Sequence, residues 1–315
     1  MTLTNHIAPD DLKSISNLQL LARTVVEGLN TGLHKSPDKG ASIDFKQHRP
    51  YVPGDDLRNL DWKVFAKSDK FFIREYEQET NLQAMLLLDA SGSMKYRSPL
   101  RKDAISKHEY AVRLSACLAY LMIRQGDSAG LLAFDTEVRA YIPPRGRAGH
   151  VGVLLDEMAK SQTAGETDLG KVLRDASSKI KRRGLIVLVS DCFGDVTHLL
   201  RGLAHYRHAN HDILILQVWD RDELDFPFKR WHRFDSLERP GEHQMLDPAQ
   251  MRRAYLQKLG AFRDQLRSGC RKQRIDLVEV TTDEPYGVAL AAYLARRQAI
   301  SGRSRNASGG RGGRR

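Results

Sequence analysis

The stretch Leu86-Leu87-Leu88-Asp89-Ala90-Ser91-Gly92-Ser93-Met94 decides how the rest of this chain is interpreted. An apolar run that ends at polar and glycine residues is typical of a buried strand leading into a loop. In α/β sheets, ligands bind at the carboxyl ends of the strands, so Asp89, Ser91 and Ser93 would offer three oxygen atoms there. Oxygen ligands suit hard divalent cations. The stretch therefore predicts a cation site.

Two other segments offer oxygen ligands at equivalent places. Residues 185–191, LIVLVSD, form a second apolar run that ends in Asp191, and residues 165–169, GETDL, form a loop that carries Thr167 into a helix. Two carboxylates and three hydroxyls leave room for water or for an outside ligand. The expected cation is Mg²⁺, with Mn²⁺ or Ca²⁺ as alternatives. The predicted metal ligands are Asp89, Ser91, Ser93, Thr167 and Asp191.

Strands and helices alternate after residue 81, which predicts the fold class. Apolar strands are expected at 83–89, 129–134, 137–142, 185–190, 213–219 and 275–280, and helices at 103–125, 151–158, 169–180, 196–209, 249–270 and 286–297. Leu-, Ile- and Val-rich strands separated by helices are typical of a mostly parallel sheet covered on both faces. We expect an α/β, doubly wound fold. Pro143-Pro144 should end the third strand, and the basic segment 181–184 should end a helix.

The chain divides into four expected parts. Residues 1–14 are predicted to be disordered, and residues 15–80 to form an N-terminal segment with a helix at 15–29, an ordered loop and a strand at 70–77. Residues 81–300 form the α/β domain, with a β-hairpin insertion at 220–247. Residues 301–315 contain five arginines and no acidic residue, and a Gly/Ser/Arg composition predicts a disordered tail.

The order of the five oxygen donors resembles the metal-ion-dependent adhesion site of von Willebrand factor A domains. An Asp-x-Ser-x-Ser motif after an apolar strand, a loop Thr and a strand-end Asp match Asp89, Ser91, Ser93, Thr167 and Asp191. The resemblance implies that the hydroxyls contact Mg²⁺ directly and that the aspartates act partly through water. It also implies that a carboxylate from a partner protein fills the open position, so that the site binds and does not catalyse.

An upstream segment narrows the resemblance. Residues 49–62, RPYVPGDDLRNLDW, resemble the signature of the DUF58 family, with Leu60 where the family usually has isoleucine. The likeness covers roughly residues 18–294. It implies a partnership with a MoxR-type AAA+ ATPase in the assembly or activation of other complexes. The same residues also have a purely structural interpretation, in which Asp55, Asp56, Arg58 and Asp61 form ion pairs that order a loop and Trp62 packs against the sheet.

The composition excludes several classes of protein. The 315 residues carry a formal net charge of +11, to which the tail contributes +5, so the remainder is only mildly basic. We expect no membrane span, because no stretch approaches the roughly 20 apolar residues that one needs. Three widely spaced cysteines without a CxxC pair suit a reducing cytoplasm, which is the expected location.

The predicted function is a non-catalytic, Mg²⁺-dependent protein-binding module. An Asp or Ser after a strand also commonly caps a helix, so the DxSxS motif alone would be weak; Thr167 and Asp191 strengthen it. Two alternatives remain. A metal-dependent hydrolase would need a general base near Asp89, and the sequence assigns none. A nucleic-acid-associated protein would depend on the tail, which lacks aromatic residues for stacking on bases, so we do not expect a nucleic-acid partner.

Overall fold

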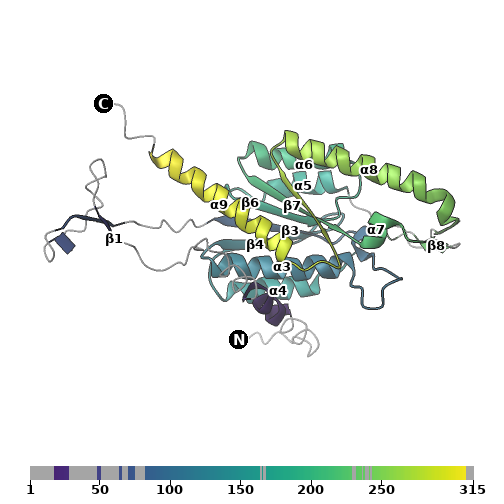
Figure 1. Cartoon of the computed structure of the whole chain (residues 1–315), viewed down its shortest axis with the longest axis horizontal. Helices are drawn as coiled ribbons and strands as arrows, with labels where there is room; N and C mark the ends of the chain where they lie inside the picture. Colours follow the sequence, from purple (N-terminus) through teal and green to yellow (C-terminus); the bar gives the residue numbers. More distant parts are fainter. Residues whose placement is uncertain are drawn as a thin grey trace, which may run out of the picture.

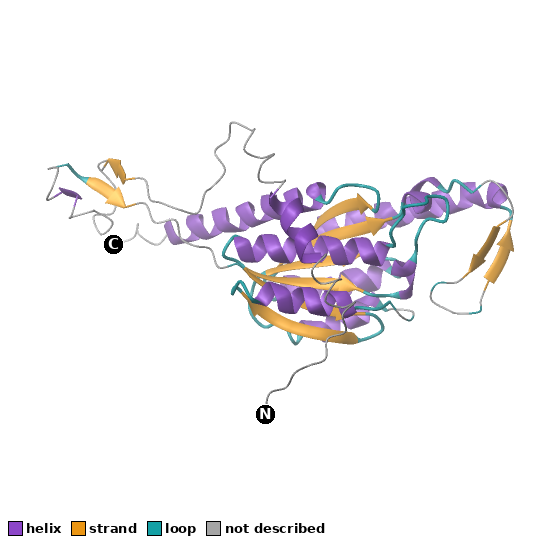
Figure 2. Cartoon of the chain, turned by 90° about the horizontal axis from the view of Figure 1, so that it is seen from below, coloured by secondary structure: helices purple, strands orange, loops and turns teal. Residues whose placement is uncertain are grey.

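The fold is a central sheet with helices on both faces (Figures 1 and 2). The computed structural model describes residues 18–27, 48–50, 64–65, 70–74, 82–163, 165, 168–228, 232–235, 237, 241 and 243–309. The sheet has six strands in the order β10-β7-β6-β3-β4-β5. Its strands are β3 (Gln83–Asp89), β4 (Ser128–Phe134), β5 (Val138–Arg145), β6 (Leu185–Ser190), β7 (Asp212–Trp219) and β10 (Asp276–Thr281).

All neighbouring strands of this sheet pair in parallel except β5, which pairs antiparallel with β4 at one edge. Counted in chain order, the strands lie 6-5-4-1-2-3, which is the usual doubly wound order read from the opposite edge. The predicted α/β, doubly wound, mostly parallel fold is therefore confirmed.

Strand β3 shows why both faces of the sheet are covered. Ala84, Leu86 and Leu88 pack into one hydrophobic cluster, whereas Met85 and Leu87 pack into the other. Side chains alternate between the two faces of a strand, so an uninterrupted apolar run needs a covering layer on each side.

Each layer consists of three helices from the α/β region. One face carries α3 (Lys107–Arg124), α4 (His150–Lys160) and α9 (Gly287–Gly309), and the other carries α5 (Leu169–Ser177), α6 (Val196–His208) and α8 (Pro248–Lys272). The helix over residues 18–27 joins the first layer. Its buried residues Leu18, Ala22 and Val26 recur every four positions and pack into the first cluster. This agrees with the amphipathic helix expected from the sequence.

Two predicted element ends are wrong. Strand β5 continues through Pro143-Pro144 to Arg145. It is an edge strand, where a missing N–H can face away from the sheet without breaking a ladder. Helix α5 ends at Ser177, before the basic segment 181–184, which instead lies in the loop that enters β6.

Helix ends on the first face also differ from the expected ones. Helix α3 begins at Lys107 because the Ser106 side chain accepts a hydrogen bond from the Glu109 N–H and caps it. Helix α9 continues to Gly309, nine residues into the segment predicted to be a disordered tail. Extending an existing helix costs much less free energy than starting one, which offsets the poor core-forming composition of that segment.

Smaller elements complete the described part of the chain. The predicted hairpin forms from β8 (His232–Asp235) and β9 (His243–Leu246), which pair antiparallel. A short helix, α7 (Arg221–Asp225), precedes it and was not predicted. From the N-terminal segment, β1 (His48–Pro50) pairs with β2 (Phe72–Arg74). Residues 1–17 and 51–63, including most of the family signature, lie outside the described residues. No described helix is long and apolar enough to cross a lipid bilayer.

Candidate metal centre

The strand order reverses between β3 and β6, the two central strands. Strand β4 lies on one side of β3, and β6 lies on the other. In doubly wound folds, ligands bind outside the carboxyl ends of the strands at this reversal. Asp89 is the last residue of β3, and Asp191 follows the last residue of β6. The topology thus brings together the two carboxylates that the sequence predicted as metal ligands.

Asp89 is held by hydrogen bonds to both carboxylate oxygens. The Ser91 N–H donates to Oδ1 at 2.8 Å, and the Ser190 hydroxyl donates to Oδ2 at 2.5 Å. The side chain is buried. Burial, followed by the nearby negative charge of Asp191, raises the pKa of Asp89 to about 7, although the hydrogen bonds from Ser190 and Ser91 act to lower it. A cation beside Asp89 would stabilise its charged form.

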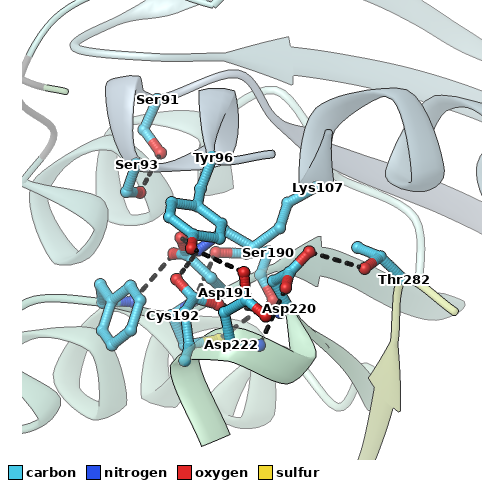
Figure 3. A network of polar contacts seen from close by, with 12 residues as sticks. Ser91, Ser93, Tyr96, Lys107, Ser190, Asp191, Cys192, Asp220, Asp222 and Thr282 are labelled. Atoms are coloured by element: carbon cyan, nitrogen blue, oxygen red, sulfur yellow. Dashed lines mark hydrogen bonds and ion pairs between the residues drawn. The ribbon is translucent and has the colours of Figure 1, made fainter. Parts of the chain in front are cut away.

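The two predicted serines converge at the start of the next loop. The Ser91 and Ser93 Oγ atoms lie 3.1 Å apart, and Figure 3 shows the two hydroxyls pointing toward each other. Ser91 is buried and Ser93 is half-buried, on the short 3₁₀ helix Gly92–Lys95. The Gly92 N–H donates to the Gly165 carbonyl oxygen at 2.9 Å, which attaches this loop to the segment before α5. Thr167, the remaining predicted ligand, lies outside the described residues.

Asp191 is more fully engaged than the sequence suggested. Its Oδ1 accepts a hydrogen bond from the Phe193 N–H at 3.0 Å, and its Oδ2 accepts one from the Lys107 ammonium at 2.8 Å. The side chain is buried. Both oxygens therefore already have protein donors, and a cation would reach Asp191 through its remaining lone pairs or through water.

Lys107 and Glu223 are charged residues of this region that the sequence interpretation missed. The Lys107 Nζ lies 2.6 Å from Glu223 Oε1 and 4.8 Å from the centre of the Phe193 ring. Lys107 is completely buried, and Figure 3 shows its side chain extending into the network of polar contacts. Burial acts to lower the pKa of Lys107, but the Asp191 and Glu223 carboxylates outweigh it and hold the pKa above its usual value. The ammonium is therefore charged at neutral pH.

A second group of polar contacts attaches α7 to the same edge of the sheet. Asp220 caps α7 by accepting from the Asp222 N–H, and its own N–H donates to Glu223 Oε2 at 2.8 Å. The Arg101 guanidinium and the Thr282 hydroxyl also donate to Asp220, at 2.7 and 2.9 Å. The Tyr96 hydroxyl donates to Asp222 Oδ2 at 3.2 Å. The loop after the serines and the start of the insertion are thus linked directly.

Ser190 and Cys192 were also missed. The Ser190 hydroxyl accepts a hydrogen bond from the Cys192 N–H at 2.8 Å while it donates to Asp89. Cys192 adopts a left-handed backbone conformation, with a φ of 59°. Non-glycine residues in this conformation are uncommon and often mark functional turns. The signal for Lys107 was helical spacing, because Lys107, Tyr110, Ala111 and Leu114 occupy the buried face of α3.

The side chains present fit a hard cation held mainly by hydroxyls. The Ser91 and Ser93 hydroxyls lie close together, and Asp89, which accepts the Ser91 N–H, has a raised pKa that a cation would lower. In the part of the chain that the structure describes, no group of three or more His, Cys, Asp or Glu is placed to hold a metal ion. These residues therefore do not form a thiolate or imidazole site. The geometry instead suits a cation that is bound by hydroxyl oxygens, with the carboxylates close by to balance its charge.

Two uncharacterized bacterial proteins are similar in sequence to this chain. The chain is 26% identical over 226 residues to the uncharacterized protein Rv1480 of Mycobacterium tuberculosis, and the match covers 69% of each chain. It is 24% identical over 153 residues to the uncharacterized protein YeaD of Bacillus subtilis, covering 48% of this chain and 35% of YeaD.

Two solved structures match the chain at low sequence identity. The conserved hypothetical protein BatB of Bacteroides thetaiotaomicron matches with a TM-score of 0.42 and 14% identity, covering 68% of this chain and 98% of BatB. The SpRpn10 VWA domain matches with a TM-score of 0.37 and 14% identity, covering 66% of this chain and 93% of that domain. The family model described as "Protein of unknown function DUF58" matches residues 47–265, which is more than half of the sequence, and the chain therefore belongs to the DUF58 family.

Proposed function

We propose that this chain is a non-catalytic module that binds a partner protein through a divalent cation. The proposed cation is Mg²⁺, with Mn²⁺ or Ca²⁺ as alternatives. The observation that supports this proposal is the convergence of the Ser91 and Ser93 hydroxyls at the reversal of strand order, beside the buried Asp89 that accepts the Ser91 N–H. Ser91, Ser93 and Thr167 would contact the cation, and Asp89 and Asp191 would balance its charge. A carboxylate from the partner would complete the coordination.

The proposed partner is a MoxR-type AAA+ ATPase, with which the module would act in assembling or activating other complexes. This part of the proposal depends on the family resemblance alone. The proposed role is binding because each carboxylate oxygen of Asp89 and Asp191 already accepts a hydrogen bond from a backbone N–H, Ser190 or Lys107, which suits carboxylates that position a cation.

Cation binding is tested first, by titrating Mg²⁺ into EDTA-treated protein and following heat and thermal unfolding. Wild type should bind and unfold at a higher temperature with Mg²⁺, since a ligand that binds only the folded state stabilises it. Asp89→Ala and Ser93→Ala should lose most of this response. Ser178→Ala, which changes an exposed serine beyond the end of α5, serves as the matched control and should keep it.

Partner binding is tested by capturing a purified MoxR-type ATPase from the same genome with wild type and the same variants, in Mg²⁺ and in EDTA. Capture by wild type in Mg²⁺ only, and loss in Asp89→Ala, supports the proposal. Equal recovery by wild type and Asp89→Ala would refute the metal-dependent form.

A further inference from the structure

Lys107 is a fully buried ammonium shared by two carboxylates on different elements. Its Nζ lies 2.8 Å from Asp191 Oδ2, at the end of β6, and 2.6 Å from Glu223 Oε1, in α7. Removing an ammonium from water costs several kcal/mol, and only close carboxylates can offset that cost. Electrostatic attraction to the two carboxylates therefore holds the ammonium in place. A further charge placed beside them must change how strongly each carboxylate attracts it.

A divalent cation at the serines would be such a charge. Asp89 accepts hydrogen bonds from the Ser91 N–H and from the hydroxyl of Ser190, the residue before Asp191, so a cation held by Ser91 and Ser93 would lie on the same edge of the sheet as both carboxylates. Lys107 and the cation would compete for the negative charge of Asp191, since each is stabilised by it. Glu223 pulls the ammonium in the opposite direction, away from β6 and toward α7.

Glu223 also fixes the position of α7. Its Oε2 accepts from the Asp220 N–H at 2.8 Å and completes the capping box of that helix, and its carbonyl oxygen accepts from the Tyr255 hydroxyl of α8 at 2.9 Å. The Lys107 ammonium is thus the single described side chain that contacts both Asp191 and the first turn of α7 by hydrogen bonds. A shift of this ammonium changes how firmly α7 is held.

We propose that Lys107 is a positioning residue that sets the affinity of the cation site and couples its occupancy to α7 and the hairpin insertion that follows it. The inference rests on the proposed cation binding. When the cation binds, the ammonium is repelled toward Glu223, and the attachment of α7 tightens. Coupling of this kind is reciprocal, so a change at Glu223 must alter the affinity of the distant cation.

Two variants should shift the affinity in opposite directions. Lys107→Met removes the competing charge with little change in shape, and Mg²⁺ should bind about tenfold more tightly. Glu223→Gln leaves the ammonium with Asp191 alone, and Mg²⁺ should bind about tenfold more weakly. The glutamine keeps an oxygen for the Asp220 N–H, so the capping box survives. Lys258→Met and Glu157→Gln change described residues of α8 and α4 for which the structure shows no hydrogen bond or ion pair to Lys107, Asp191 or Glu223, and they should leave the affinity unchanged.

The affinities are measured by calorimetric titration of Mg²⁺ into each EDTA-treated protein, and hydrogen exchange of residues 220–226 is followed with and without Mg²⁺. Mg²⁺ should slow this exchange in wild type and not in Lys107→Met. If Lys107→Met does not fold, the double variant Lys107→Met/Glu223→Gln removes the unpaired charge, and it should also bind Mg²⁺ more tightly than wild type.

The outcomes separate the two proposals. Opposite shifts in affinity support the inference. Mg²⁺ binding by wild type with unchanged affinity, or with shifts in the same direction, in Lys107→Met and Glu223→Gln overturns the inference and leaves the cation site standing. Absence of Mg²⁺ binding in wild type and in all variants overturns the cation site, and the inference falls with it.

Discussion

The Ser190 hydroxyl donates a 2.5 Å hydrogen bond to Asp89 Oδ2 and so joins the ends of the two central strands. The Ser190 Oγ also accepts a hydrogen bond from the Cys192 N–H at 2.8 Å, which fixes the left-handed turn that follows β6. One buried hydroxyl therefore positions the principal carboxylate of the site and the turn that presents Asp191. Neither contact involves a proposed metal-binding hydroxyl, so Ser190 can be changed without removing a ligand.

Ser190→Ala should lower the free energy of unfolding by about 1–3 kcal/mol, because it leaves a buried carboxylate oxygen and a buried N–H without a partner. Chemical denaturation in EDTA measures this loss. Ser115→Ala is the matched control: Ser115 is buried in α3, and its hydroxyl has no hydrogen-bond partner among the described residues. That control should be neutral or slightly stabilising. Equal losses in both variants would contradict the role given to Ser190.

Binding of Mg²⁺ should weaken as the pH falls below about 7. The raised pKa of Asp89 means that a proton competes with the cation in this range, and affinity should drop by up to about tenfold per pH unit. Titrations at pH 6 and pH 8 in the same ionic strength test this. Asp89→Asn, which carries no titrating group, should bind weakly at both values, and equal wild-type affinities at pH 6 and pH 8 would exclude control by Asp89.

Stability in the absence of metal should respond to Asp89 in the opposite sense. The pKa of Asp89 rises from an ordinary value of 3.8 to about 7 in the folded protein, so the folded state binds more protons between these values. The contribution of Asp89 to the free energy of unfolding is complete below pH 3.8 and is lost as the pH rises toward 7. Wild type measured against Asp89→Asn in EDTA at pH 5 and pH 8 isolates this contribution; wild type should lose more stability than the variant over that interval.

His211 should make the protein sensitive to mild acid. It is buried, its Nδ1 accepts a hydrogen bond from the Gly184 N–H at 3.2 Å, and burial lowers the pKa of its ring. Below its ordinary pKa of 6.5, the His211 ring binds a proton more readily in the unfolded chain than in the folded protein. The free energy of unfolding is therefore highest above pH 6.5 and declines as the pH falls below that value. His211→Asn should give a shallower decline between pH 6.5 and pH 5 than wild type. His205→Asn, at an exposed position on α6, should keep the wild-type slope.

Strands β3 and β6 could be predicted to the residue because their apolar runs end in Asp89 and before Asp191, and both faces of a central strand must be apolar. The end of β5 could not be predicted. Whether Pro143-Pro144 breaks a strand depends on whether that strand lies at an edge, and pairing is a property of the whole sheet.

In the candidate site, too, residues set by local sequence could be predicted, and contacts between distant parts of the chain could not. The oxygen donors Asp89, Ser91, Ser93 and Asp191 follow from strand ends and from the family motif. Lys107 and Glu223 are 116 positions apart, and their contact depends on where α7 folds back against α3. Helical spacing could place Lys107 on the buried face, but it could not supply its partners.

Gly170 belongs to a glycine motif that resembles a phosphate-binding loop, but the fold gives this glycine a role in helix packing. The spacing Gly165-x-x-x-x-Gly170-Lys171 imitates a phosphate-binding loop, yet a Cβ on Gly170 would overlap the His198 carbonyl group of α6. The glycine therefore allows α5 and α6 to approach closely, and Gly202 on the facing helix does the same, since its Cβ would lie 2.7 Å from the Gly170 oxygen. Gly170→Ala should lower the free energy of unfolding by about 1–3 kcal/mol through forced separation of the helices.

Gly152 in α4 is the matched control, because a Cβ there meets nothing within 4 Å. Gly152→Ala should raise the free energy of unfolding by about 0.5–1 kcal/mol, the usual gain from replacing glycine with alanine inside a helix. Chemical denaturation of both variants gives the two values. Opposite signs would show that the glycine at 170 serves helix packing. A stabilised Gly170→Ala would mean that α5 and α6 are not in contact at this point, and the structural explanation of the motif would fail.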